Sequence, residues 1–157
     1  MIDLNKLGII ADKDTINLDQ IIKQVRSETQ FRNAGDFIIF SGIVRESSSV
    51  SSKKVQQIEI QAYKEMAEKQ LNQICVELIE KYNLVDARVV HYTGLFNVGD
   101  FLVHCIIASK HRKEGFKAIT ELIEAYKHRA YIFKCEIYDD GTSEWISTDQ
   151  VEKIHQK

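Results

Sequence analysis

The sequence contains no proline, only three cysteines and no long hydrophobic run. Without proline, no turn and no helix start can rest on the fixed φ angle of that residue. Cys75, Cys105 and Cys135 are widely spaced and form no Cys-x-x-Cys pair, which argues against a disulfide framework and a zinc knuckle. No segment approaches the roughly 20 apolar residues of a membrane span, and the charged N-terminus lacks a signal-peptide core. We therefore expect a cytoplasmic protein with reduced thiols and no membrane segment.

The composition is that of an ordinary globular protein, with 44% hydrophobic and 28% charged residues among 157. A chain of this length buries a single core, so we expect one domain spanning residues 1–157. The formal net charge of −2 argues against a nucleic-acid binder, because such domains are usually basic. The charge is nevertheless uneven. Residues 109–134 contain seven Lys or Arg and only three Glu, so a positively charged region lies within an acidic protein.

The hydrophobic pattern predicts six strands and three helices. The expected strands are Gly8–Ala11, Phe37–Arg45, Val55–Tyr63, Ala87–Thr93, Phe101–Ser109 and Tyr131–Tyr138, and the expected helices are about Leu18–Ser27, Lys64–Tyr82 and Lys113–His128. The strand 37–45 is apolar enough to be buried on both faces, and the serine-rich segment 46–54 has the composition of a mobile loop. This order of elements implies an α+β sandwich in which helices cover a mixed or antiparallel sheet.

Lys127 and Lys134 form the sharpest candidate site. Lys127 lies at the end of an expected helix and Lys134 in the next strand, so the intervening turn can bring both ammonium groups to one end of the sheet. A second cation about 6 Å away lowers a lysine pKa by about two units, which leaves the lysine mostly protonated and suited to hold anions. Only added desolvation would make it a base or a nucleophile. The alternative is an ordinary helix-end cation and a solvated strand lysine.

Three further cations and one thiol each allow two interpretations. His111 and Arg112 follow a strand and precede a helix, where free N–H groups and basic side chains suit a phosphate or a carboxylate. The alternative for this pair is an ordinary helix start with solvated side chains. Arg45, at a strand end, is either a third site cation or an exposed arginine. Cys135 points away from Lys134 by strand alternation, so we interpret it as an inert thiol.

Five short fragments follow one another along the chain. They are FSGIVR (Phe40–Arg45), EIQAYKEMAEKQL (Glu59–Leu71), SKHRKEGF (Ser109–Phe116), YKHRAYIFKCE (Tyr126–Glu136) and DGTSEW (Asp140–Trp145). Together they resemble the catalytic large subunit of molybdopterin synthase, and the resemblance runs from about Gly35 to Trp145. It implies an α/β hammerhead-type α+β domain that forms a homodimer.

The same resemblance implies a sulfur transfer reaction and a protein partner. Each protomer of the family binds a small ubiquitin-like sulfur-carrier subunit, so two of each make a heterotetramer. The carrier's C-terminal Gly-Gly tail ends as a thiocarboxylate and enters a pocket of the large subunit. Two sulfurs delivered in this way convert cyclic pyranopterin monophosphate, a pterin phosphate, into the dithiolene of molybdopterin. The resemblance implies no metal or organic cofactor.

The resemblance also implies which residues form the site. The family's two pocket lysines, the catalytic pair, fall on Lys127 and Lys134. The cations that would bind the phosphate of the substrate fall on Arg45, His111 and Arg112. The positions that line the family's pocket or its channel for the carrier tail fall on Phe40, on Met66 and on the backbone around Ile43, Val44, Cys135 and Glu136.

The chain departs from the family pattern at three usual prolines, which are replaced by Lys64, Lys110 and Tyr131, and at a usual tryptophan, replaced by Phe133. We expect the same extended backbone at the proline positions, with a cost of several tenths of a kcal/mol for each lost restraint. The fold should therefore survive these replacements.

Two other functions fit parts of the sequence. A phosphate- or nucleotide-binding module without turnover would use the same cations, and it would bind small phosphates without forming a complex with a carrier. An RNA-binding sheet is disfavoured by the net charge and by the lack of aromatic residues interleaved with basic ones. We therefore expect a sulfurtransferase that binds no nucleic acid.

Overall fold

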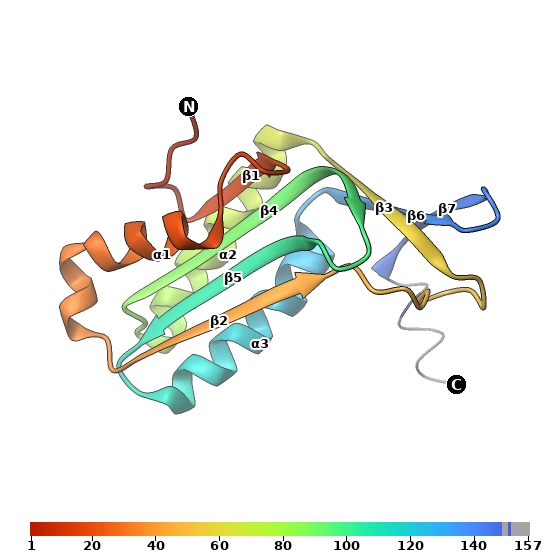
Figure 1. Ribbon diagram of the computed structural model, residues 1–157. Coiled ribbons are helices and arrows are strands. Elements are labelled where there is room, and N and C mark those ends of the chain that lie inside the picture. The colour runs from red at the N-terminus through yellow and green to blue at the C-terminus, as the bar shows by residue number, and fades with distance from the viewer. Residues whose placement is uncertain (149–150, 152–157) are drawn as a thin grey trace.

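The computed structural model describes residues 1–148 and 151, and it has an α+β arrangement (Figure 1). The strands are β1 (Gly8–Asp12), β2 (Asp36–Ile43), β3 (Val55–Ala62), β4 (Asp86–Asn97), β5 (Phe101–Ser109), β6 (Ile132–Tyr138) and β7 (Ser143–Ile146), and the α-helices are α1 (Leu18–Ser27), α2 (Lys64–Tyr82) and α3 (Arg112–Arg129). A 3-10 helix, η1 (Thr29–Asn33), and strand β7 add to the elements expected from the sequence. The predicted fold class is confirmed.

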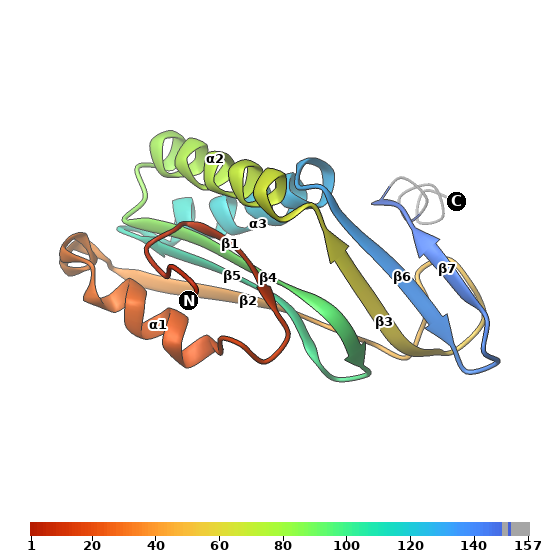
Figure 2. The same cartoon turned by 90° about the horizontal axis from the view of Figure 1, so that it is seen from above.

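The seven strands form one mixed sheet in the order β2-β5-β4-β3-β6-β7, with β1 beside β4. Among the strands of the described residues, only β1 and β4 pair in parallel, and the other neighbours are antiparallel. Strand β4 joins two parts of the sheet, because its first half pairs with β5 and its last residues pair with β3. Gly94 lies at this junction with φ +124°, which favours glycine. Figure 2 shows β3, β6 and β7 extending as an arm from the rest of the sheet.

Helices cover both faces of the larger part of the sheet (Figure 2). Helices α2 and α3 pack on one face through Leu71, Ile74 and Leu122, which belong to one hydrophobic cluster with residues of β4 and β5. Helix α1 packs Ile21 and Val25 on the other face. The start of α1 is fixed by a capping box between Asn17 and Gln20, and α2 ends at Asn83 in the left-handed conformation, as its pattern predicts. None of the helices in the described part is long and apolar enough to cross a membrane.

Two expectations about the strand 37–45, its end and its burial on both faces, are wrong. Strand β2 ends at Ile43 and not at Arg45, and it is an edge strand paired only with β5, so Ile39 and Ile43 remain exposed. The serine-rich loop 46–54 is held in place by local hydrogen bonds. The backbone N–H of Val55 donates to the carbonyl of Glu46 at 2.7 Å, and the Ser48 hydroxyl accepts from the N–H groups of residues 50 and 51 at 3.1 and 3.0 Å. The Ser48 hydroxyl therefore stabilises a turn within this loop.

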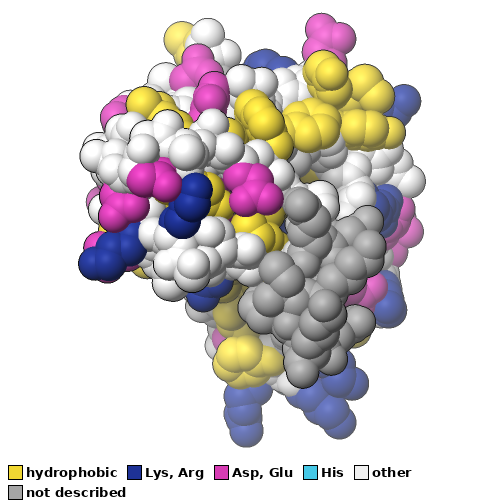
Figure 3. All heavy atoms as spheres, turned by 90° about the vertical axis from the view of Figure 1, so that its right-hand side faces the viewer, with side chains coloured by type: hydrophobic (Ala, Val, Ile, Leu, Met, Phe, Trp, Pro, Cys, Tyr) yellow, Lys and Arg dark blue, Asp and Glu magenta, His cyan; other side chains and the backbone are white. Residues whose placement is uncertain are grey.

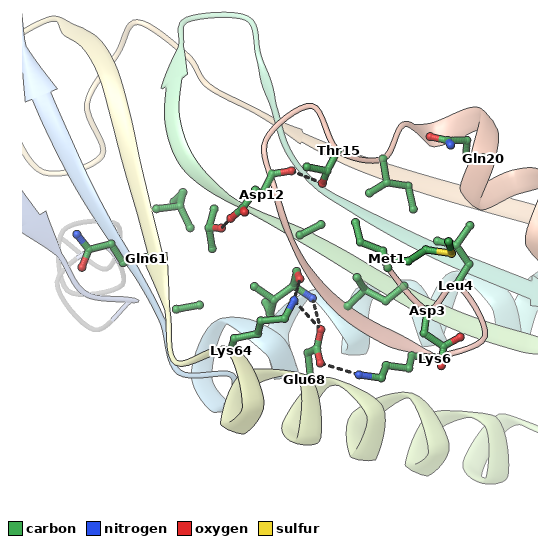
Figure 4. A pocket seen from close by; sticks show the side chains of 18 residues that line it. Met1, Asp3, Leu4, Lys6, Asp12, Thr15, Gln20, Gln61, Lys64 and Glu68 are labelled. Atoms are coloured by element: carbon green, nitrogen blue, oxygen red, sulfur yellow. Dashed lines mark hydrogen bonds and ion pairs between the residues drawn. The ribbon is translucent and has the colours of Figure 1, made fainter.

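Side chains of α2 satisfy the free edge of β1 (Figure 4). Lys64, at a usual proline position, donates to the carbonyl of Ile10 at 2.5 Å, and Glu68 accepts from the Ile10 N–H at 3.2 Å and pairs with Lys6 at 2.9 Å. The Asn72 side chain likewise accepts a hydrogen bond from the N–H of Gly8 and donates one to the Gly8 carbonyl. These contacts border a cavity of about 1170 Å³ under the N-terminal segment. Lys64 therefore supplies a hydrogen bond between α2 and β1.

At Tyr131, a second position with an expected extended backbone in place of proline, the expectation is wrong. The φ angle of Tyr131 is +38°, so the backbone is left-handed at the residue before β6 and is not extended. Proline fixes φ near −65° and cannot adopt this conformation. A non-glycine residue in this region carries a strain of about 1 kcal/mol or more. The turn between α3 and β6 therefore differs from the one that a proline would make.

Candidate functional site

Three cations from three separate segments of the chain line one pocket of about 680 Å³. Arg45 lies two residues beyond β2, Lys127 lies in the last turn of α3, and Lys134 lies in β6. Phe40 and Ile43 of β2 line the same pocket, as do further residues of β2 to β7, of α3 and of the segments that follow β2 and β7. These are Ser41, Gly42, Ser49, Ile60, His91, Leu102, Val103, Glu124, Tyr126, Ile132, Ile146, Ser147, Thr148 and Val151. The structure thus brings together five of the residues selected from the sequence.

The chain reversal between α3 and β6 creates this arrangement. Helix α3 ends at Arg129, and Tyr131 turns the chain so that β6 runs back between β3 and β7. Lys134 then lies opposite Ile60 of β3 and Ile146 of β7, both of which line the pocket. The Thr148 hydroxyl donates to the carbonyl of Lys127 at 3.0 Å and ties the segment after β7 to the end of α3.

Burial is the main influence on Lys134. Loss of solvent lowers the pKa of its ammonium, and the positive charges of Lys127 and Arg45 lower it further, while the Glu136 carboxylate opposes the change. From the sequence we considered charge proximity first, whereas the structure makes desolvation the largest cause. A lysine of this kind releases a proton more readily than a solvated one, while its neighbours keep the pocket positively charged.

The Glu136 carboxylate accepts hydrogen bonds from the loop that follows β2. Glu136 is 2% exposed and accepts hydrogen bonds from the Ser48 hydroxyl, from the Ser49 N–H at 3.3 Å and from the Tyr138 hydroxyl at 3.0 Å. The Ser49 hydroxyl in turn accepts from Arg45 Nη2 at 3.1 Å. A buried carboxylate therefore anchors the loop residue that holds the Arg45 guanidinium at the pocket.

Three other candidates from the sequence do not place their side chains in this pocket. Val44 is buried, and its N–H donates to the Asp100 carbonyl at 3.0 Å. Cys135 is buried and reduced, and alternation along β6 directs it to the face opposite Lys134. Met66 lies exposed in the first turn of α2.

His111 and Arg112 lie at the opposite end of β5 from the pocket within one chain. Strand β2 is antiparallel to β5, and its last residue, Ile43, pairs with Phe101 at the start of β5. Arg45 follows this end of β2, whereas His111 and Arg112 follow Ser109 at the other end of β5. The length of β5 separates the two ends by about 26 Å at 3.3 Å per residue. Both side chains are exposed, with His111 at the N-cap of α3. One chain alone therefore does not join this pair to the lysines.

Sequence reasoning missed His91 as a pocket residue. His91 of β4 is 6% exposed, lies in a T-shaped contact with the Tyr126 ring at 5.7 Å between ring centroids, and lines the pocket. In the sequence, His91 stands out only as a polar residue on the inward-facing side of an otherwise apolar strand. We assigned it no role on that basis.

An exposed apolar surface lies on the other face of the β3-β6-β7 arm. This aromatic surface consists of Tyr63, Tyr131, Phe133 and Trp145, which are between 43% and 63% exposed. The Tyr63 and Phe133 rings meet edge to face at 5.4 Å between centroids. Hydrophobic side chains gather at the end of the molecule that Figure 3 presents, where the arm lies. Exposed apolar patches mark interaction sites in soluble proteins, so this surface is a candidate docking surface.

Comparison with known proteins gives consistent results. A family model described as MoaE protein matches residues 11–129. A molybdopterin synthase catalytic subunit of Pyrococcus abyssi is 30% identical over 146 residues, which cover 93% of this chain and 94% of that protein. The crystal structure of molybdopterin synthase from Staphylococcus aureus superposes with a TM-score of 0.78 at 30% identity, covering 94% of this chain and 99% of the other.

A third match shows the same fold in an assembly. A chain from the complex of subunits 1 and 2 of molybdopterin-converting factor from Helicobacter pylori superposes with a TM-score of 0.68 at 20% identity, covering 90% of each chain. The matches to the family model and to the relatives extend over most of the sequence. The relatives are catalytic subunits, and none of these matches supports a module that only binds phosphate. The chain therefore belongs to the MoaE family of molybdopterin synthase catalytic subunits.

Proposed function

We propose that the pocket formed by Arg45, Lys127 and Lys134 is the place where sulfur passes from a thiocarboxylated carrier to cyclic pyranopterin monophosphate. The convergence of three cations in one partly apolar pocket carries this proposal. Both the thiocarboxylate and the substrate phosphate are anions, and charge-assisted hydrogen bonds to them are about twice as strong as neutral ones. The reaction needs positive charge at the place where negative charge develops, and the pocket offers it.

The surroundings of the three cations suit each of them to a different role in the reaction. Arg45 presents a planar guanidinium held by Ser49, which suits a phosphate. Lys127 and Lys134 hold the thiocarboxylate and stabilise the anionic intermediates that form as sulfur adds to the pterin side chain. Lys134 is also a proton donor, because its lowered pKa makes the loss of a proton easier.

The carrier would dock on the aromatic surface beside the pocket. The Helicobacter pylori complex supports a second subunit as partner, since one of its chains shares this fold. Phe133 and Lys134 are neighbours in β6 and face opposite sides of the arm. A carrier bound to the aromatic surface therefore reaches the pocket when its C-terminal tail passes around the edge of the arm. A flexible Gly-Gly tail suits this path because glycine tolerates close approach and sharp turns.

A homodimer would complete the phosphate site. His111 and Arg112 lie far from Arg45 in their own chain, so the pair can join the lysines only if a second copy supplies it. We propose that each pocket combines the lysines of one protomer with the His-Arg pair of the other, as closed two-fold symmetry permits. We further propose that residues 1–157 act as one cytoplasmic domain, a location that agrees with its three free, buried cysteines.

Mixed dimers test the shared pocket directly. Lys127→Ala and Arg112→Ala chains are each inactive alone in the proposed arrangement. After co-expression, about half of the dimers contain one chain of each kind, and each such dimer has one intact pocket, so about a quarter of the wild-type activity returns. No recovery would contradict sharing of the pocket between protomers.

The proposed reaction is tested by reconstitution. The protein, a thiocarboxylated carrier and cyclic pyranopterin monophosphate should yield the dithiolene, and the same carrier with an ordinary carboxylate terminus should yield none. Binding of the pterin phosphate without any dithiolene would favour a module that only binds.

A further inference from the structure

Ser49 lines the pocket with a hydroxyl whose hydrogen is not used inside the chain. Its Oγ accepts a hydrogen bond from Arg45 Nη2 at 3.1 Å. A serine hydroxyl has two lone pairs and one hydrogen, and this hydrogen rotates toward an acceptor that lies near. Within residues 1–148 and 151, the Ser49 hydroxyl donates to no acceptor. It is therefore able to donate to a molecule bound in the pocket.

Two other hydroxyls of the pocket wall are already engaged. Ser41 Oγ lies 2.8 Å from Nδ1 of His104, and the Thr148 hydroxyl donates to the carbonyl of Lys127 at 3.0 Å. Ser49 differs from both because its neighbour, a guanidinium, offers donors and no lone pair. The Ser49 hydroxyl thus adds a second kind of donor beside Arg45.

The main chain around Ser49 is held in place by a buried carboxylate. The Ser49 N–H donates to Glu136 Oε1 at 3.3 Å, and the Ser48 hydroxyl donates to the other oxygen of the same carboxylate. The Ser48 hydroxyl also accepts from the N–H groups of Val50 and Ser51. The residues on both sides of Ser49 are therefore fixed before any ligand binds, which lowers the entropy lost on binding.

The ends of the same loop are tied to each other and to the β6–β7 turn. Ser47 and Lys54 form an isolated antiparallel bridge. The Lys53 ammonium lies 3.0 Å from the Asp140 carboxylate, which belongs to the turn after β6. The loop 46–54 therefore forms a wall of the pocket, with Ser49 presented at a defined place beside Arg45.

We propose that Ser49 binds the phosphate of the pterin substrate directly, with its hydroxyl as donor to one phosphate oxygen and the Arg45 guanidinium as donor to another. The two groups lie 3.1 Å apart, so one phosphate can contact both. Phosphate oxygens are acceptors, and hydrogen bonds to an ionised acceptor are about twice as strong as neutral ones. The inference rests on the proposed function for the identity of the ligand, and it adds a binding residue from the serine-rich loop.

A calorimetric titration of the protein alone with cyclic pyranopterin monophosphate measures this contact before any reaction. Ser49→Ala should weaken binding about tenfold, since one hydrogen bond to a charged group is lost. Ser49→Thr keeps the hydroxyl and should bind within about threefold of the wild type. Ser52→Ala is the matched control, because Ser52 is an exposed serine of the same loop without a side-chain partner in the described part of the chain. It should bind as the wild type does.

An Arg45→Ala background separates direct binding from a role in which Ser49 only holds Arg45. With direct binding, Ser49→Ala should weaken the affinity by a further factor of about three or more, because the hydroxyl still reaches the phosphate. No further loss in this background would overturn the inference. Unchanged affinity in Ser49→Ala alone, or no binding of the pterin phosphate to the wild type, would overturn it as well.

The reconstituted reaction distinguishes a failure of this inference from a failure of the proposed function. Ser49→Ala should raise the KM for the pterin about tenfold with a much smaller change in kcat, and its affinity for the carrier should stay the same. Dithiolene formation with an unchanged KM would reject the role of Ser49 and leave the proposed function standing. Weaker pterin binding by Ser49→Ala, in a protein that makes no dithiolene, would support the role of Ser49 and reject the proposed function.

Discussion

Replacing Lys134 by methionine should make the protein more stable and nearly inactive. Methionine fills a similar volume without charge, so the cost of burying an ammonium beside Lys127 and Arg45 disappears. Removal of such an unfavourable group is typically worth about 1 kcal/mol in the free energy of unfolding. The loss of a donor to the developing anion should slow dithiolene formation on the order of 100-fold or more.

The gain in stability has a defined pH dependence. Because the pKa of Lys134 is lower in the folded than in the unfolded protein, protonated Lys134 opposes folding fully below its folded pKa. The stability of the wild type should therefore rise relative to the variant as the pH increases from the folded pKa through the ordinary value of 10.5. Urea unfolding of both proteins between pH 7 and pH 10 measures this difference. A variant that is less stable than the wild type at pH 7, or that keeps its activity, would refute the reasoning.

Two further predictions concern the surroundings of the pocket. Trp145→Ala should weaken binding of the carrier at least tenfold by calorimetry, as expected for an aromatic interface residue, whereas Phe116→Ala, an exposed aromatic on α3, should not; equal affinities would remove the aromatic surface as the docking site. Tyr131→Gly should raise the free energy of unfolding by up to about 1 kcal/mol because it relieves a φ of +38°, and Tyr131→Pro should lower it. The opposite order of the two variants in thermal unfolding would exclude the left-handed turn.

The long elements were predictable because local signals agree with the packing. Helix α2 has its expected bounds, since its apolar period is regular and Asn83 can adopt the left-handed conformation that ends it. Strand β7 escaped prediction because it has four residues and is defined by pairing with β6. The end of β2 was misplaced because pairing with β5, a long-range interaction, decides where the strand stops.

The candidate site was predictable only in part for the same reason. Residue type and position offered Arg45, Lys127 and Lys134 only as candidates, the family resemblance selected them, and the fold brings them to one pocket. The position of the His-Arg pair depends on the antiparallel register of β2 and β5, which a single sequence does not encode visibly. His91 carried no local signal, because its place on the pocket wall depends on the neighbours that β6 and α3 bring there.

The most direct test of the central claim is a single-turnover assay of dithiolene formation with Lys127→Ala. The variant should fold and bind the carrier as the wild type does, because Lys127 lies in the last turn of α3 with its side chain at the pocket. With thiocarboxylated carrier and cyclic pyranopterin monophosphate in excess, the wild type should form the dithiolene and the variant should form none that is detectable. Dithiolene formation at the wild-type rate in the folded variant would contradict the assignment of this pocket as the site of sulfur transfer.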